Sequence, residues 1–158
     1  MTTTLGVTTA MYAGFFHEAH VAMRDVVGGL SPALLDWRPG PDTNSIAALV
    51  AHALDSERNL TAIVAGVPLT RDRDAAFRVV GLAAEDLVAM IDAAERDVDG
   101  FLLLVTDDRL DAPIERPMRT ASGAAWLVRA AVHSREHLGQ ATLTRQLAEQ
   151  AVVAQRGN

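Results

Sequence analysis

The sequence predicts an all-α protein, an up-and-down four-helix bundle formed by one domain that spans residues 1–158. Three observations support this fold class. Apolar residues recur every three or four positions in four long segments, as they do on the buried face of a helix. Glycine and proline cluster between those segments, where helices end. No segment shows the alternation of apolar and polar residues that a half-buried strand requires.

The first helix is expected at residues 8–27, where Phe16 and Met23 belong to a broad apolar stripe. The glycine pair at 28–29 ends this helix, because glycine is a poor helix former and readily takes up the conformation of a helix C-terminus. A proline-rich loop follows at residues 30–43.

The second helix is expected at residues 44–65, with Ile46 and Leu54 on its buried face and Gly66 as its end. Three polar residues at its start can accept hydrogen bonds from the free amides of the first turn. These N-cap candidates are Asp42, Thr43 and Asn44. A charged connector follows at residues 71–78.

The third helix is expected at residues 82–105, and the fourth at 123–150 with Ser122 as its N-cap. Residues 107–120 between them are expected to be irregular, because two prolines and an acidic cluster interrupt any periodicity. The last eight residues are expected to fray.

Composition and charge exclude several classes of function. The net charge is −6, whereas a nucleic-acid-binding protein needs a basic face to neutralise phosphates, so no nucleic-acid partner is expected. The absence of cysteine excludes disulfides, thiolate metal sites and a protein thiol nucleophile. The N-terminus has no basic leader pattern and no apolar run approaches the length of a membrane span. We therefore expect no membrane partner and a cytoplasmic location.

Three histidines are the main candidates for a functional site. His133 and His137 are four residues apart in the fourth helix, so both rings leave the same helix face. His52 lies on the second helix and would meet that pair if the two helices pack antiparallel. Three neutral imidazoles with an open fourth position form the ligand set of a catalytic divalent metal site. Such a set suits zinc, nickel, copper or iron.

Polar residues near these histidines are candidates for supporting roles. On the second helix, Asp55 and Ser56 follow His52 by three and four residues, so either could orient a ligand or contact a substrate. A buried imidazole without a partner costs about 1–3 kcal/mol, which a metal would offset. Helical spacing on the fourth helix defines one stripe of five residues. Its members are Trp126, Arg129, His133, His137 and Gln140.

Other histidine-based sites have less support. His17 and His20 form a weaker pair on the first helix; they could be surface residues or partners that orient a metal ligand, and the surface is favoured. Residues 133–137 also match the H-x-x-E-H pattern of one protease class, with Glu136 as general base. Only 21 residues follow, however, with no suitable third ligand. The Glu-x-x-His motif of di-iron bundles does not occur in the chain.

Three stretches of the chain resemble the DinB-like proteins. The first is L-D-W-R-P at residues 35–39, continued by P-D-T-N-S-I at 41–46. The second is L-V-A-H at 49–52 with Glu57 after it. The third is H-S-R-E-H-L-G-Q at 133–140, followed by Arg145. The resemblance covers most of the chain in order and spacing.

This resemblance implies a DinB/YfiT-type four-helix bundle, often a homodimer, in which His52, His133 and His137 bind zinc or nickel. Characterised relatives include thiol-dependent enzymes that use bacillithiol or mycothiol, among them a maleylpyruvate isomerase and S-transferases. The isomerase type has a glutamate as the middle ligand, where this chain has His133. The chain is therefore more similar to the three-histidine branch.

These observations lead to one functional hypothesis and two alternatives. We expect a metal-dependent enzyme that transfers a low-molecular-weight thiol to an electrophilic small molecule. The thiol must be borrowed, because the chain has no cysteine. Arg129 and Trp126 are candidates for binding this cofactor, while a surface arginine and a core tryptophan are the ordinary alternatives. The alternative functions are a metal-dependent hydrolase and a non-enzymatic, stress-associated dimeric bundle.

Overall fold

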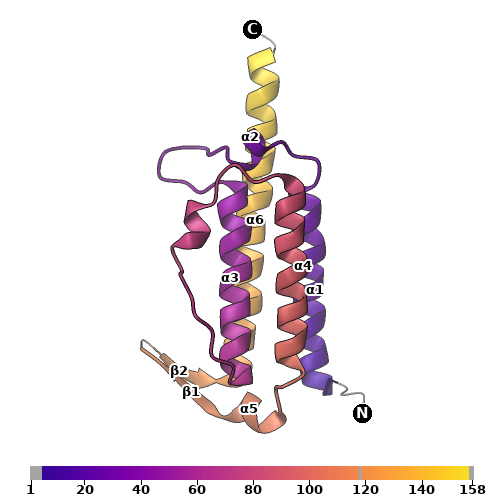
Figure 1. Cartoon of the computed structure of the whole chain (residues 1–158), viewed down its shortest axis with the longest axis vertical. Coiled ribbons are helices and arrows are strands. Elements are labelled where there is room, and N and C mark those ends of the chain that lie inside the picture. Colours follow the sequence, from indigo (N-terminus) through magenta and orange to yellow (C-terminus); the bar gives the residue numbers. More distant parts are fainter. Residues whose placement is uncertain (1–4, 118, 157–158) are drawn as a thin grey trace.

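Four long helices dominate the computed structural model, which describes residues 5–117 and 119–156 (Figure 1). These helices are α1 (Val7–Val27), α3 (Ile46–Ala65), α4 (Ala84–Leu102) and α6 (Gly123–Arg156). They lie along the long axis of the molecule, and the predicted all-α four-helix bundle is confirmed. None of the described helices is both long enough and apolar enough to span a membrane.

The helices follow one another around the bundle in the order α1, α4, α3, α6, so that each packs against two neighbours. The chain runs up α1, down both α3 and α4, and back up α6 (Figure 1). This path differs from a strict up-and-down alternation, because the connector at residues 66–83 returns along the outside of α3 before α4 begins. The helices α3 and α6 are antiparallel, which is the arrangement that convergence of the histidines requires.

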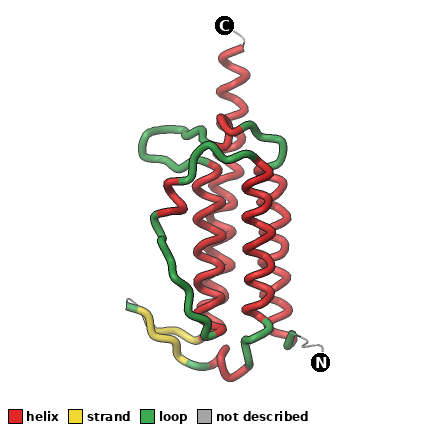
Figure 2. Tube along the Cα trace, in the orientation of Figure 1, coloured by secondary structure: helices red, strands yellow, loops and turns green. Residues whose placement is uncertain are grey.

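The connecting segments contain short elements that the sequence pattern did not reveal (Figure 2). They are α2 (Pro32–Leu35), the 3-10 turn η1 (Ala75–Arg78), α5 (Asp107–Asp111), β1 (Pro113–Arg116) and β2 (Arg119–Ser122). The two strands form an antiparallel hairpin in the segment that we expected to be irregular. Four residues per strand are too few to establish a period of two, so the prediction missed them.

Helix ends follow local capping chemistry. Ser45, and none of the three expected residues, caps α3: its Oγ accepts a hydrogen bond from the amide three residues on, at 3.3 Å. Ser122 accepts the equivalent bond at the start of α6, also at 3.3 Å, which confirms the predicted cap. Gly66 ends α3 as predicted, with a left-handed φ of 77°. The carboxylate of Asp86 accepts from the backbone before α4 at 2.9 Å, so this helix begins later than residue 82.

The last helix is longer than expected. It extends to Arg156, past the predicted end at residue 150, whereas residues 157–158 lie outside the described part of the chain. The reason is that neither glycine nor proline occurs between Gly139 and Gly157, so nothing in the sequence stops the helix earlier.

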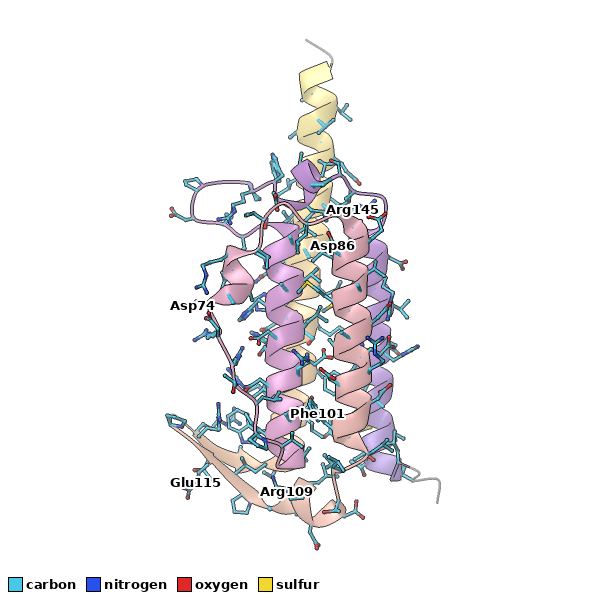
Figure 3. The ribbon with its side chains drawn as sticks, viewed as in Figure 1. Asp74, Asp86, Phe101, Arg109, Glu115 and Arg145 are labelled. Atoms are coloured by element: carbon cyan, nitrogen blue, oxygen red, sulfur yellow. The ribbon has the colours of Figure 1, made fainter. Side chains whose placement is uncertain are left out.

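Two arginines satisfy the free carbonyls at helix C-termini (Figure 3). Arg145 of α6 donates to the carbonyl oxygens of Asp25 at 2.7 Å and Val26 at 2.9 Å, at the end of α1. Arg109 of α5 donates to the carbonyl oxygens of Ile63 at 3.1 Å and Val64 at 2.9 Å, at the end of α3. Both arginines therefore tie a later segment of the chain to the end of an earlier helix.

A polar layer divides the apolar core into two clusters. On α1 the buried His20 separates Phe16 of one cluster from Met23 of the other. Buried polar residues interrupt the facing helices in the same way, Glu57 on α3 and Ser134 on α6. The helix that brings His52 and Glu57 into the bundle thus has apolar packing on either side of them.

The junction between β2 and α6 gives a testable prediction about stability. A Cβ atom at Gly123 would lie 2.1 Å from the carbonyl oxygen of Arg109, so Gly123→Ala should force the hairpin and α5 away from the helix. We expect a loss of about 1–3 kcal/mol in the free energy of unfolding, measured by urea denaturation. Gly14→Ala is the control, since Gly14 has open space around it and lies inside α1. That variant should be stabilised by up to about 1 kcal/mol, and an equal effect of both substitutions would contradict the steric argument.

Candidate metal centre

The antiparallel packing of α3 and α6 brings three histidines together. One nitrogen from each of His52, His133 and His137 can be chosen so that all three lie within 4.8 Å of one another. His52 is buried at 4 % exposure, whereas the other two are half-buried. The group thus lies at the edge of the α3–α6 interface, where a small molecule can approach from the solvent side.

The three rings make T-shaped contacts with one another. Their centroids are 4.4–5.1 Å apart, and each pair of ring planes makes an angle between 76° and 88°. Nε2 of His133 lies 3.1 Å from Nε2 of His52. Three mutually perpendicular imidazoles that approach through their nitrogens leave one common point in front of them.

Two of the three imidazoles, those of His52 and His133, have the charge state that a metal ligand needs. Burial lowers the pKa of His52 to about 4, and the other two histidines and Arg71 add to the shift. Burial, followed by the neighbouring His137, also lowers the pKa of His133. Both rings are therefore neutral near pH 7 and keep a lone pair for coordination.

The donor set fits a divalent metal ion. Two imidazole nitrogens bound to one tetrahedral zinc ion, each at its usual distance, lie roughly 3.3 Å apart. The 3.1 Å between the Nε2 atoms of His52 and His133 is close to that value. Nδ1 of His52 is buried without a hydrogen-bond partner among the described residues. The three histidines could therefore hold a metal ion with only small side-chain adjustments.

Gln140 and Phe77 support two of the three rings. Oε1 of Gln140 lies 2.9 Å from Nδ1 of His137, an arrangement in which Nδ1–H donates and Nε2 is left with the lone pair. The ring of Phe77, in η1, packs on the ring of His52 with centroids 4.4 Å apart and an interplanar angle of 31°. Gln140 was a candidate from its position on the stripe, but Phe77 was missed. It is the one aromatic residue in the charged connector, a signal that could have marked it.

The two candidates after His52 on α3 have different surroundings. The carboxylate of Asp55 accepts a hydrogen bond from Nε of Arg71 at 2.6 Å, which ties the connector to α3 beside the histidines. Ser56 is buried at 8 % exposure. Asp55 therefore holds the connector in place, and its contact with Arg71 keeps a positive charge near His52.

Arg129 and Trp126 lie on the same side of α6, toward the hairpin. Arg129 lines a pocket of 390 Å³ whose wall also includes His133. Trp126 is buried, and its Nε1–H donates to the carbonyl oxygen of Ile114 at 3.2 Å. A larger groove of 610 Å³ runs between α1 and α6, but none of the three histidines lines it. The smaller pocket is therefore the one that reaches the candidate metal centre.

The expectation that His20 lies at the surface is wrong. His20 is 1 % exposed, and its Nε2 lies 2.6 Å from Oε1 of Glu57, which is fully buried. The distance is that of an ion pair, although the two groups are not aligned as a hydrogen bond. Position predicts this burial, since His20 falls on the apolar stripe between Phe16 and Met23. His17, three residues earlier, is largely exposed as expected and contacts Glu95 at 2.5 Å.

Glu57 connects this buried layer to the histidines of α6. Oγ of Ser134 donates to Oε2 of Glu57 at 2.6 Å, and Ser134 lies between His133 and His137 in the sequence. The carboxylate thus joins three helices, because His20 contacts it from α1 and Ser134 from α6. Its contact with Ser134 fixes the rotation and height of α6 relative to α3, and with them the positions of the three rings.

Removal of the buried carboxylate should destabilise the bundle strongly. Glu57→Ala would leave Ser134 and His20 without their partner and open a cavity, so we expect a loss of about 3–5 kcal/mol in the free energy of unfolding. The matched control is Asp97→Ala, which breaks a half-exposed ion pair with Arg58 and should cost less than about 1 kcal/mol. Thermal and urea unfolding measure both, and equal losses would show that the buried layer has no special structural role.

Comparison with known proteins identifies the family. The sequence model of the DinB superfamily matches residues 16–141, a range that includes all three histidines. No curated protein sequence matches the chain. A crystal structure of a conserved protein from Enterococcus faecalis is similar with a TM-score of 0.77 and 16 % identity, covering 93 % of this chain and 99 % of that one.

A second crystal structure, a DinB-like protein from Bacillus subtilis, is similar with a TM-score of 0.69 and 18 % identity, covering 86 % of this chain and 90 % of that one. At such identities the two structures support the fold alone, whereas the family match extends over most of the sequence. The predicted resemblance is confirmed, and the chain belongs to the DinB superfamily.

Proposed function

We propose that this protein is a divalent-metal-dependent enzyme that transfers a low-molecular-weight thiol, of the mycothiol or bacillithiol type, to an electrophilic small molecule. The observation that carries the proposal is the convergence of three imidazoles beside a pocket, in a chain without cysteine. A protein of this composition can do thiol chemistry only with a thiol from solution. Zinc and nickel are the proposed metals, since both suit imidazole ligands.

In this proposal His52, His133 and His137 hold the metal, and their neighbours keep them in place. Imidazoles that coordinate through a lone pair add no charge, so a bound ion would keep its full charge and would lower the pKa of a thiol or water bound to it. Gln140 orients the ring of His137, and Phe77 shields one face of His52 from water. In the overall reaction a bond forms between the thiol sulfur and the electrophilic carbon. The bond to the leaving group breaks, and the thiol proton is released with that group.

Further residues are proposed for binding and positioning. Arg129, in the pocket wall beside His133, would bind an anionic part of the thiol. Ser56 and Asp55 follow His52 on α3, and the contact of Asp55 with Arg71 would keep the connector closed over the site. Trp126 is buried, and its Nε1–H already donates a hydrogen bond to the backbone. A role of Trp126 in cofactor binding stays a prediction. The homodimer and the cytoplasmic location also stay predictions.

Metal content provides the first test. Untagged protein dialysed against zinc or nickel and then against buffer should contain about one divalent ion per chain, measured by ICP-MS. His137→Ala should contain much less, because two imidazoles hold the ion far more weakly than three. His17→Ala removes an exposed histidine of α1 and should leave the metal content unchanged. Metal-free wild-type protein after exposure to both metals would contradict the proposal.

Catalysis is tested with a thiol and a reactive electrophile. Zinc-loaded protein should accelerate the reaction of mycothiol or bacillithiol with monochlorobimane, followed by the fluorescence of the thioether. His52→Ala should lower this rate by at least about tenfold, because it removes a ligand from the metal, whereas His17→Ala should not. Turnover that requires the metal but no thiol would favour the hydrolase. Metal binding without turnover of any kind would favour the non-enzymatic bundle.

A further inference from the structure

The pocket beside His133 has more positive than negative side chains in its wall. Two arginines from different elements line it, Arg119 from β2 and Arg129 from α6. Most of the remaining wall consists of small aliphatic side chains of α6. Because His133 belongs to the same wall, a molecule in this pocket would lie next to the candidate metal centre.

Neither arginine is neutralised within the described part of the chain. No ion pair with a carboxylate is formed there by Arg119 or Arg129, although acidic residues outnumber arginines by 20 to 14. Other arginines do form such pairs. These are Arg24, Arg58, Arg71, Arg78, Arg135 and Arg145. The one carboxylate in the pocket wall, Glu136, lies 3.9 Å from Nδ1 of His133.

The guanidinium of Arg119 has a defined position. It lies over the ring of Trp126, 5.9 Å from the centroid. Trp126 is itself held by burial and by its hydrogen bond to the backbone of β1. A guanidinium near an aromatic ring still has N–H groups that can donate to a ligand. The contact with Trp126 therefore restricts where the guanidinium of Arg119 lies and leaves it able to bind an anion.

We infer that this pocket binds the oxyanion group, a carboxylate or a phosphate, of a small molecule that reacts at the metal centre, either the thiol or its electrophile, with Arg119 and Arg129 as the groups that bind it. Its identification as part of the substrate rests on the proposed function; the binding of an oxyanion does not. Guanidinium donors match the geometry of planar and tetrahedral oxyanions in pairs. The pocket volume of 390 Å³ and its aliphatic wall suit a small organic anion.

The location of the pocket also explains how an acidic protein can attract an anion. The net charge of −6 repels anions at long range. Positive groups also lie near the three histidines: Arg71 and Arg73 act on His52, and Arg129 and Arg71 act on His133, where the carboxylate of Glu136 opposes them. These arginines therefore offset part of the overall negative charge at the place where an anion would bind.

The experiment compares three ligands with the same ring: benzoate, phenyl phosphate and the uncharged benzamide. Isothermal titration calorimetry measures their affinities for metal-free and for zinc-loaded protein. We expect at least one of the two anions to bind in both states and benzamide to bind at least about tenfold more weakly, the loss expected for a charge-assisted hydrogen bond. The stronger of the two anions identifies the oxyanion as carboxylate or phosphate.

Variants assign the binding to the two arginines. Arg129→Gln and Arg119→Gln should each weaken the anion by at least about tenfold. Arg58→Gln, which removes a half-exposed arginine of α3 paired with Asp97, should leave the affinity unchanged. Circular dichroism checks the fold of each variant. If the three variants have equal effects, or if anions bind only to the zinc-loaded protein and do so independently of both arginines, the inference is wrong.

The outcome separates this inference from the proposed function. Anion binding that requires Arg119 and Arg129 in protein without thiol transferase activity would support the pocket and contradict the function. Metal-dependent thiol transfer that is insensitive to Arg129→Gln and Arg119→Gln, with no binding of either anion, would support the function and overturn the pocket.

Discussion

The antiparallel packing of α3 against α6 is the contact on which the rest of the site depends. It brings His52 opposite His133 and His137, which are four residues apart on one face of their helix. The contact is specified by a polar layer in the middle of the bundle, where the buried carboxylate of Glu57 accepts from Ser134. Sliding or rotating α6 would break this bond and separate the rings, so the same register serves folding and the candidate metal centre.

A buried carboxylate between helices costs desolvation free energy. Apolar residues of similar volume would give an equal or greater free energy of unfolding. The benefit of the carboxylate is directional. Apolar contacts tolerate small shifts of one helix along another, whereas a hydrogen bond of 2.6 Å between Ser134 and Glu57 does not. We interpret the polar layer of Glu57 and Ser134 as the element that sets the positions of the three histidines through the helix backbones. Gln140 and Phe77 contact the rings of His137 and His52 directly and restrict their orientation.

The long connector determines which side of the site is open. By returning along the outside of α3 it places Phe77 over His52 and Arg71 against Asp55, so that face is covered. Toward the β1–β2 hairpin, at the end of the bundle where α6 begins, lies the pocket that reaches His133. Its wall contains Arg119 and Arg129, which form no ion pair among the described residues, and one carboxylate, that of Glu136, so positive side chains outnumber negative ones there in a negatively charged protein.

The sequence by itself determined the four helices, the end of α3 at Gly66, the cap at Ser122 and the three candidate ligands. Each of these follows from local chemistry: a 3.6-residue period, a glycine at a left-handed position, a short polar side chain and an i, i+4 spacing. The tertiary structure alone decided the parallel course of α3 and α4, the contact of His20 with Glu57, and the positions of Phe77 and Arg119 beside the site. These features depend on which surfaces meet when residues far apart in the chain come together. No local sequence pattern encodes the path of the 18-residue connector at 66–83. Nor does one encode which residue contacts a single polar side chain, such as that of His20, on an apolar stripe.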